Sequence, residues 1–232
     1  MNSYAPELIE SNAQSRAFDF IKEEILSMRL RPMQRLNAGE LALQLGMSRT
    51  PVREALSRLQ QESLVARDVG GGFSVRSITL GEILDFYRVR EALEVEAALE
   101  ALPHMNAQRL ATLESLLRTA KSLLHPSKYA EFVLANREFH AAIMDTSGNG
   151  AFRLVMAPIV DRVRLVGAML IQLHAPRQRE VYEENHRIFE AFRKADAGEL
   201  EQAVRAHVGQ ARQHAEQLLA SNRNSLVLSA TH

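Results

Sequence analysis

The sequence of 232 residues contains no cysteine. This absence excludes a disulfide framework, a thiol nucleophile and a metal site with cysteine ligands. The chain also has no excess of charge, since 28 basic residues balance 28 acidic ones. A nucleic-acid-binding face in such a chain must therefore come from a local excess of basic residues.

Targeting and membrane signals are also missing. The first twelve residues lack a cationic start followed by an apolar core, so we expect no signal peptide. The most apolar segment, residues 154–173, is interrupted by Asp161, Arg162 and Arg164, which argues against a membrane span. With 46% hydrophobic and 24% charged residues, the composition is that of an ordinary globular chain. We expect two domains and a cytoplasmic location.

The most informative stretch covers residues 41–56. It predicts a short helix, a tight turn at Gly46 and a second helix capped by Ser48. The opening turns of the second helix carry three candidate DNA-contacting residues, Arg49, Thr50 and Arg53. A helix-turn-helix protein inserts this end of its second helix into the major groove. The same spacing also occurs in helical hairpins that bind no DNA.

The flanking sequence favours the DNA-binding interpretation. Residues 15–28 have the apolar spacing of an amphipathic helix. Two short β-prone runs, 64–67 and 73–76, surround three consecutive glycines and predict a hairpin. Three helices followed by a hairpin make a winged helix. Residues 29–76 contain eight arginines and only four acidic residues, which is the expected local basic excess.

From residue 79 to about residue 221 the pattern is helical. Six segments separated by proline, glycine or short polar connectors cover residues 79–102, 106–124, 128–146, 151–173, 177–195 and 198–221. Their short connectors predict an antiparallel all-α bundle. We therefore expect a mainly α protein with a winged-helix domain over residues 1–78 and an all-α domain over residues 79–232.

Histidines in the helical half form a candidate metal site. Asn136 and His140 are four residues apart, so both project from one face of the third bundle helix. His186 and His207 lie on the fifth and sixth helices. Imidazole nitrogens and a side-chain oxygen that converge from three helices can bind a divalent transition metal. Taken singly, each histidine is more simply explained as a core or surface residue.

The segment 45–56 resembles the recognition segment of the GntR family of bacterial transcription regulators. The resemblance implies that five positions contact operator DNA: Arg49, Thr50, Arg53, Gly71 and Gly72. The chain departs from the family at Ala38 and Gly39, where the family often has a glutamate and a DNA-contacting arginine. This departure affects the expected operator sequence and leaves the expected fold unchanged.

The helical half resembles the FCD effector domain of the FadR branch of that family, in its six-helix VanR-like form. The resemblance implies zinc or nickel bound by Asn136, His140, His186 and His207, and a small carboxylate effector held by Arg90. The neutral amide of Asn136 is a poorer ligand than a carboxylate. The missing negative charge should favour an anionic effector as an additional ligand.

Together these resemblances imply a ligand-responsive homodimeric regulator, commonly a repressor, that binds double-stranded operator DNA. One alternative is the same regulator with a metal-free effector pocket. Another is a helical-bundle metalloenzyme, since residues 183–186 contain one Glu-x-x-His motif. A di-iron bundle requires a second copy, which the sequence lacks, and no general base or nucleophile accompanies the histidines. We therefore expect no enzymatic activity.

Overall fold

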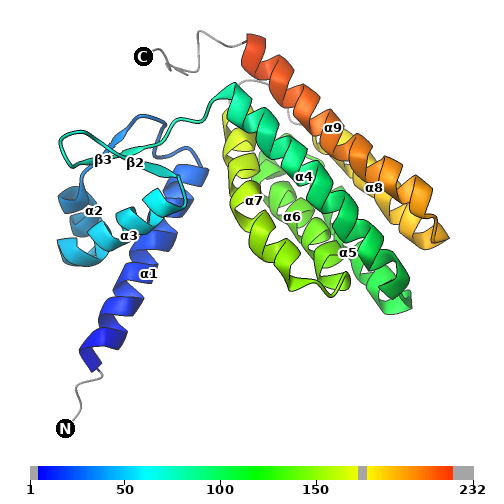
Figure 1. Cartoon of the computed structure of the whole chain (residues 1–232), viewed down its shortest axis with the longest axis horizontal. Coiled ribbons are helices and arrows are strands. Elements are labelled where there is room, and N and C mark those ends of the chain that lie inside the picture. Colours follow the sequence, from blue (N-terminus) through cyan, green and yellow to red (C-terminus); the bar gives the residue numbers. More distant parts are fainter. Residues whose placement is uncertain (1–4, 172–176, 222–232) are drawn as a thin grey trace. The chain divides into compact units, whose positions relative to one another are not determined.

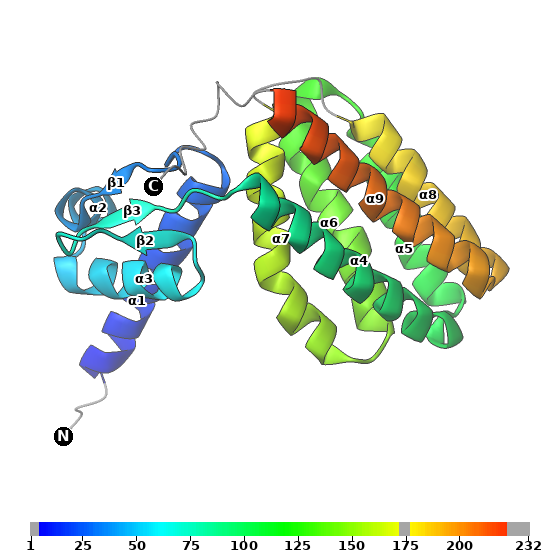
Figure 2. The same ribbon diagram turned by 45° about the horizontal axis from the view of Figure 1, so that its top comes forward.

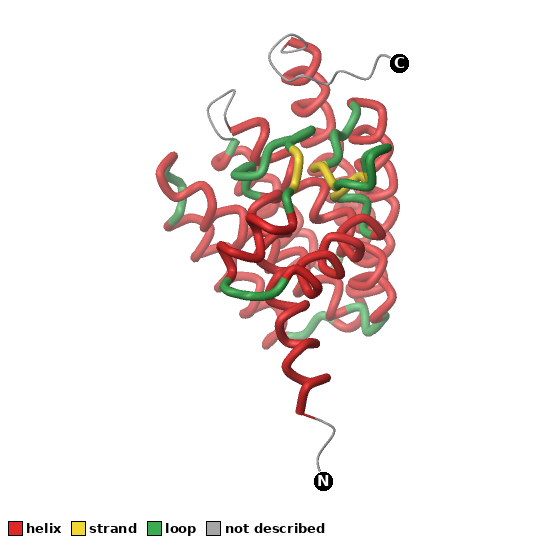
Figure 3. The backbone as a smooth tube through the Cα atoms, turned by 90° about the vertical axis from the view of Figure 1, so that its left-hand side faces the viewer, coloured by secondary structure: helices red, strands yellow, loops and turns green. Residues whose placement is uncertain are grey.

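The computed structural model describes residues 5–171 and 177–221, and these are mainly helical (Figure 1). The first of two compact units ends at Thr79, and the second begins at Leu80. Strands occur only in the first unit among the described residues (Figure 3). The predicted fold class, a winged helix-turn-helix followed by an all-α bundle, is confirmed.

The first unit contains three helices and one antiparallel sheet (Figure 2). Its elements are α1 (Ala5–Leu26), β1 (Arg35–Leu36), α2 (Ala38–Leu45), α3 (Arg49–Gln61), β2 (Val65–Arg67) and β3 (Phe73–Val75). The predicted hairpin is β2 paired with β3. β1, which was not predicted from the sequence, pairs with the other edge of β3. Two residues are too few to show an alternating apolar pattern.

The core of the first unit lies between α1 and α3. Ile21 and Ile25 on α1 and Leu56 and Leu59 on α3 are completely buried. Their spacing of three or four residues places them on one side of each helix. Each such side chain contributes about 1.5–3 kcal/mol when it leaves water. One face of α3 is therefore packed against α1, and its opposite face stays exposed to solvent.

Local backbone signals set the limits of α2 and α3. The Asn37 side chain caps α2 by accepting a hydrogen bond of 2.8 Å from the Gly39 amide. Gly46 ends α2 in the left-handed region, with φ of 64°. Ser48 is the N-cap of α3, as predicted, but its side chain makes no capping hydrogen bond. The turn and cap together orient the first residues of α3.

The second unit is a bundle of six helices within the described residues (Figure 2). They are α4 (Leu80–Ala101), α5 (Ala107–Ser122), α6 (Tyr129–Thr146), α7 (Gly150–Ile171), α8 (Gln178–Lys194) and α9 (Ala197–Ser221). Short 3₁₀ turns, Leu102–His104 and Pro126–Lys128, precede α5 and α6. These limits agree closely with the prediction, although the predicted end of α7 at residue 173 lies outside the described residues.

The interior of the bundle is mostly apolar. Phe139 of α6 and Phe192 of α8 are fully buried, and they belong to a core cluster with Ile188 and Val204. A few polar side chains are buried beside this apolar core. None of the helices in the described residues is long and apolar enough to cross a membrane.

Candidate functional site

The exposed face of α3 carries the predicted DNA-contacting residues. Arg49, Thr50 and Arg53 are exposed, whereas Pro51 and Val52 are buried. The buried residues anchor the helix in its unit. The exposed residues therefore extend from a rigid support, although their contact with DNA stays a prediction.

Two further features accompany this face. A side chain added at Gly39 would meet the Arg49 Nε atom at 3.3 Å, so Gly39 provides the space in which Arg49 lies. Gly71 and Gly72 are exposed between β2 and β3, as expected for the tip of a wing. Gly71 has φ of +79°, which L side chains rarely adopt.

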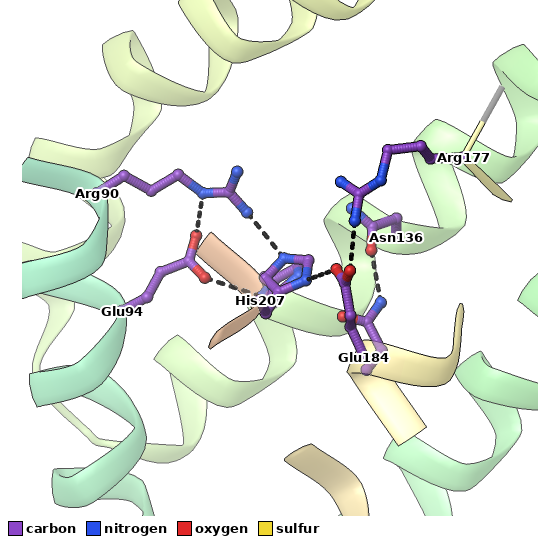
Figure 4. Close-up of polar contacts among 8 residues, drawn as sticks. Arg90, Glu94, Asn136, Arg177, Glu184 and His207 are labelled. Carbon is purple, nitrogen blue, oxygen red and sulfur yellow. Dashed lines mark hydrogen bonds and ion pairs between the residues drawn. The ribbon is translucent and has the colours of Figure 1, made fainter. Parts of the chain in front are cut away.

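The bundle contains a second candidate site, which we call the polar cluster (Figure 4). It comprises Arg90 and Glu94 of α4, Asn136 and His140 of α6, Arg177 at the N-cap of α8, Glu184 and Asn185 of α8, and His207 of α9. Figure 4 shows Arg90 and Glu94 on one side of His207, and Glu184 and Arg177 on the other. The cluster thus joins segments that are distant in sequence.

The two histidine rings of the cluster stack on each other, and each has a carboxylate near its Nδ1 atom. The rings of His140 and His207 are stacked, with centroids 4.8 Å apart. Nδ1 of His207 is 2.9 Å from Oε2 of Glu184. Nδ1 of His140 is 3.2 Å from Oε2 of Glu94, although this contact is not aligned as a hydrogen bond. A carboxylate at Nδ1 favours the tautomer with its proton there and leaves Nε2 as an acceptor.

Arg90 closes the cluster on one side. Its Nε donates to Oε1 of Glu94 at 2.5 Å, and its Nη2 lies 3.2 Å from Nε2 of His207. A guanidinium has no acceptor, so His207 must accept this hydrogen bond. On the other side, Arg177 donates to Oε1 of Glu184. Two arginines and two glutamates thus alternate around a neutral histidine.

Burial and neighbouring charge set the protonation states. Burial is the largest influence on His207 and, together with the neighbouring Arg90 and His140, lowers its pKa to about 4 against the opposing hydrogen bond to Glu184. Burial alone would raise the pKa of Glu94, but Arg90 and His140 outweigh it and hold that pKa well below its usual value. At neutral pH, Glu94 is therefore ionised and His207 is neutral, which is the form that binds metals.

The structure does not bring the four predicted metal ligands together as a set. Asn185 donates from Nδ2 to Oδ1 of Asn136 at 2.6 Å, and its own Oδ1 is buried with no hydrogen-bond partner in the described part of the chain. His186 is the next residue, about 100° further around α8. The His186 ring lies beside Tyr182 and Phe189, with centroids 6.1 and 6.3 Å away. Asn185 therefore takes the place expected for His186.

The sequence itself contains a signal for the position of Asn185. Ile188, Phe189 and Phe192 form the buried stripe of α8, and Asn185 continues it one turn earlier. Periodicity thus places Asn185 rather than His186 on the core face. Glu94, one helix turn after Arg90, forms a buried ion pair with it. Glu184 and Arg177 were missed, because their pairing depends on the folded bundle.

The polar cluster fits a divalent transition metal in its donor atoms. Glu94, His140 and His207 offer ligand atoms within 4.8 Å of one another. The His140 Nε2 atom is buried without a hydrogen-bond partner among the described residues, as a ligand nitrogen would be. A cavity of about 10 Å³, lined by Glu94 and His140 among apolar neighbours, is the size of one water or ion.

Comparison with known proteins agrees with both units. Residues 13–75 match the model of the bacterial regulatory proteins of the gntR family, and residues 85–210 match the FCD domain. The FCD match covers the polar cluster from Arg90 to His207. The members of these families that resemble this chain are transcription regulators rather than enzymes.

Related proteins extend over most of the chain. An uncharacterised HTH-type transcriptional regulator, YdhC of Bacillus subtilis, is 26% identical over 209 residues, covering 90% of this chain and 93% of its own length. The Nta operon transcriptional regulator of Aminobacter aminovorans is 32% identical over 139 residues, covering 60% of this chain and 66% of its own.

A solved structure shows the same fold. The structure of Escherichia coli McbR/YncC has a TM-score of 0.76 and 25% identity, and the match covers 91% of this chain and 99% of that one. The similarity thus includes the winged helix and the helical bundle. With its exposed helix-turn-helix and its buried polar cluster, the chain belongs to the GntR family of bacterial transcription regulators and carries a C-terminal FCD effector domain.

Proposed function

We propose that the protein is a cytoplasmic, ligand-responsive homodimer, acting as a repressor, that binds operator DNA through two winged helices. A metal-assisted site for a small carboxylate in the FCD domain would control its DNA affinity. A ligand shifts such an equilibrium only if it prefers one arrangement of the protein. The proposal therefore requires that effector binding changes the polar cluster.

Support for the DNA-binding part comes from α3. Its exposed arginines, Arg49 and Arg53, stand at the helix start on a unit with a local basic excess. Arginine can donate two hydrogen bonds to a guanine edge or bind a phosphate. In a dimer, two such helices read half-sites about 34–36 Å apart, one turn of DNA.

Support for the effector part comes from Arg90. It is buried, and its guanidinium can donate two parallel hydrogen bonds to a carboxylate. The cavity of about 10 Å³ beside Glu94 is far smaller than the roughly 300 Å³ or more of a typical ligand pocket. An organic effector must therefore displace side chains of the cluster. Such displacement provides the change that regulation needs.

The metal part is carried by the two stacked histidines with a carboxylate at each Nδ1. In this arrangement, Nε2 of His140 and Nε2 of His207 are the natural ligand atoms. Glu184 orients the ring of His207, Glu94 lies beside the ring of His140, and the side-chain oxygen of Asn185 supplies a further acceptor. A bound divalent ion would contribute positive charge that attracts an anionic effector.

Elemental analysis of untagged protein purified without chelator tests the metal part. We expect about one equivalent of zinc or nickel in the wild type and its loss in His140→Ala and His207→Ala. His186→Ala is the matched control and should retain the metal, because His186 lies outside the cluster. If the double variant of His140 and His207 still carried a full equivalent of metal, the metal would have to bind elsewhere and the proposed site would be wrong. A metal-free wild type would favour the alternative pocket built around Arg90 alone.

A further inference from the structure

Nε2 of His207 has a single lone pair, which both Arg90 and the proposed metal ion would use. In the structure it accepts from Nη2 of Arg90 at 3.2 Å, while Nδ1 faces Glu184. A neutral imidazole has one acceptor nitrogen, so that nitrogen cannot accept from a guanidinium and ligate a metal at the same time. One of the two cations must leave before the other binds.

Arg90 is built so that it can move without losing its own partner. Its Nε is held by Oε1 of Glu94 at 2.5 Å, and only Nη2 reaches His207. Rotation about the Nε contact would take Nη2 away from the imidazole and keep the ion pair. A divalent ion on His207 would repel the nearby guanidinium and favour this rotation.

We propose that Arg90 and the metal ion compete for Nε2 of His207, so that metal binding releases the guanidinium fork for a carboxylate. The inference rests on the proposed metal and effector site, and adds the step that couples them. Metal should strengthen carboxylate binding because it frees the group that the carboxylate needs. By linkage, the carboxylate should strengthen metal binding by the same factor.

The test variant is Arg90→Lys. Lysine keeps a positive charge beside the buried Glu94 and so avoids an uncompensated carboxylate. Its single ammonium lacks the fork that joins Glu94 to His207. Arg205→Lys is the matched control, because Arg205 lies on α9, is about half exposed and pairs with Glu91 and Glu201 outside the cluster.

The measurement is the zinc dissociation constant of each full-length protein, obtained by competition with a chromophoric chelator. Loss of a hydrogen bond from a charged donor should tighten zinc binding by Arg90→Lys about tenfold or more. The control should bind zinc like the wild type. Equal affinity in wild type and Arg90→Lys would overturn the competition and leave the metal site standing.

Two further results separate this inference from the proposed function. If the wild type binds no zinc and Arg90→Lys binds one equivalent, the competition holds and metal assistance in the wild type is wrong. If neither protein binds zinc, both ideas fail. Circular dichroism and thermal melts of the same preparations report that each variant is folded.

A measurement on the wild type alone covers the case in which the variant does not fold. Nitrogen-15 NMR of the guanidinium groups should show a shift of the Arg90 Nε–H signal when zinc is added. The signal of Arg162, which is also buried but lies on α7, should stay in place. An unchanged Arg90 signal at zinc saturation would overturn the inference.

Discussion

At the residue scale, neighbouring positions on one helix have opposite environments. Asn185 is buried and bonded to Asn136, whereas His186 lies against aromatic rings outside the cluster. Glu183 is exposed and Glu184 is buried against His207. A single residue step on α8 thus decides whether a side chain takes part in the site, because each step turns the helix by about 100°.

Glu184→Gln should weaken metal binding. The carboxylate of Glu184 accepts from Nδ1 of His207 and so orients Nε2, and a neutral amide accepts that bond more weakly. Loss of such a supporting group lowers metal affinity by about 10–100-fold. The readout is the chelator concentration that removes half of the metal.

Glu183→Gln is the control for this change, since it alters the same residue type one position earlier on an exposed side. It should leave the chelator midpoint unchanged. A Glu184→Gln midpoint equal to that of the wild type would mean that Glu184 does not support a metal ligand.

At the scale of elements, the arginines of α3 have two different environments. Arg49 and Arg53 are exposed at the start of the helix. Arg58 instead lies over the ring of Phe18, with its guanidinium carbon 3.9 Å from the ring centroid. Such a contact joins α3 to α1 and contributes to the stability of the unit. The basic excess of the sequence therefore overstates the number of arginines that are available for DNA contact.

Alanine replacement should separate these two groups of arginines. Arg49→Ala and Arg53→Ala should each weaken operator binding by about 1–3 kcal/mol for a base contact, or weaken all DNA equally for a phosphate contact. Arg58→Ala should lower the thermal unfolding temperature and leave DNA affinity nearly unchanged. Fluorescence anisotropy on operator and random duplexes, together with thermal melts, tests this division. An operator affinity that is unaffected in both Arg49→Ala and Arg53→Ala would disprove the recognition-helix assignment.

At the scale of the whole molecule, regulation requires two sites in two compact units. The winged helix offers exposed polar groups, and the bundle offers a buried cluster with little free space. Under the proposed function, effector binding in the bundle alters the preference for DNA, and by linkage DNA alters effector affinity by the same factor. A dimer adds a geometric requirement, since both heads must reach their half-sites together.

Half-site spacing tests the dimer. Inserting five base pairs between the half-sites of an operator rotates one by about half a turn relative to the other. Affinity should then fall to that of a single half-site, because the second head no longer meets its site. Inserting ten base pairs returns the two half-sites to the same face of the DNA and serves as the control for the added length. Equal affinity for all three duplexes would indicate that a single head suffices.

Much of the architecture was determined by the sequence alone, because its signals are local. The cap at Ser48, the turn at Gly46 and the spacing of apolar residues act within a few positions. They were enough to predict the winged helix, the six bundle helices and the exposed start of α3. The pairing of Arg90 with Glu94 can also be predicted from the sequence, because the two residues are one helix turn apart.

Only the tertiary structure decided the composition of the polar cluster. Arg90 meets His207 across 117 positions, and Asn185 meets Asn136 across 49. Such pairs depend on how α4, α6, α8 and α9 are rotated against one another. That rotation is set by burial of whole helix faces rather than by any motif. For this reason the sequence indicated histidines in the bundle, while the fold selected His140 and His207, placed Asn185 beside them and left His186 outside.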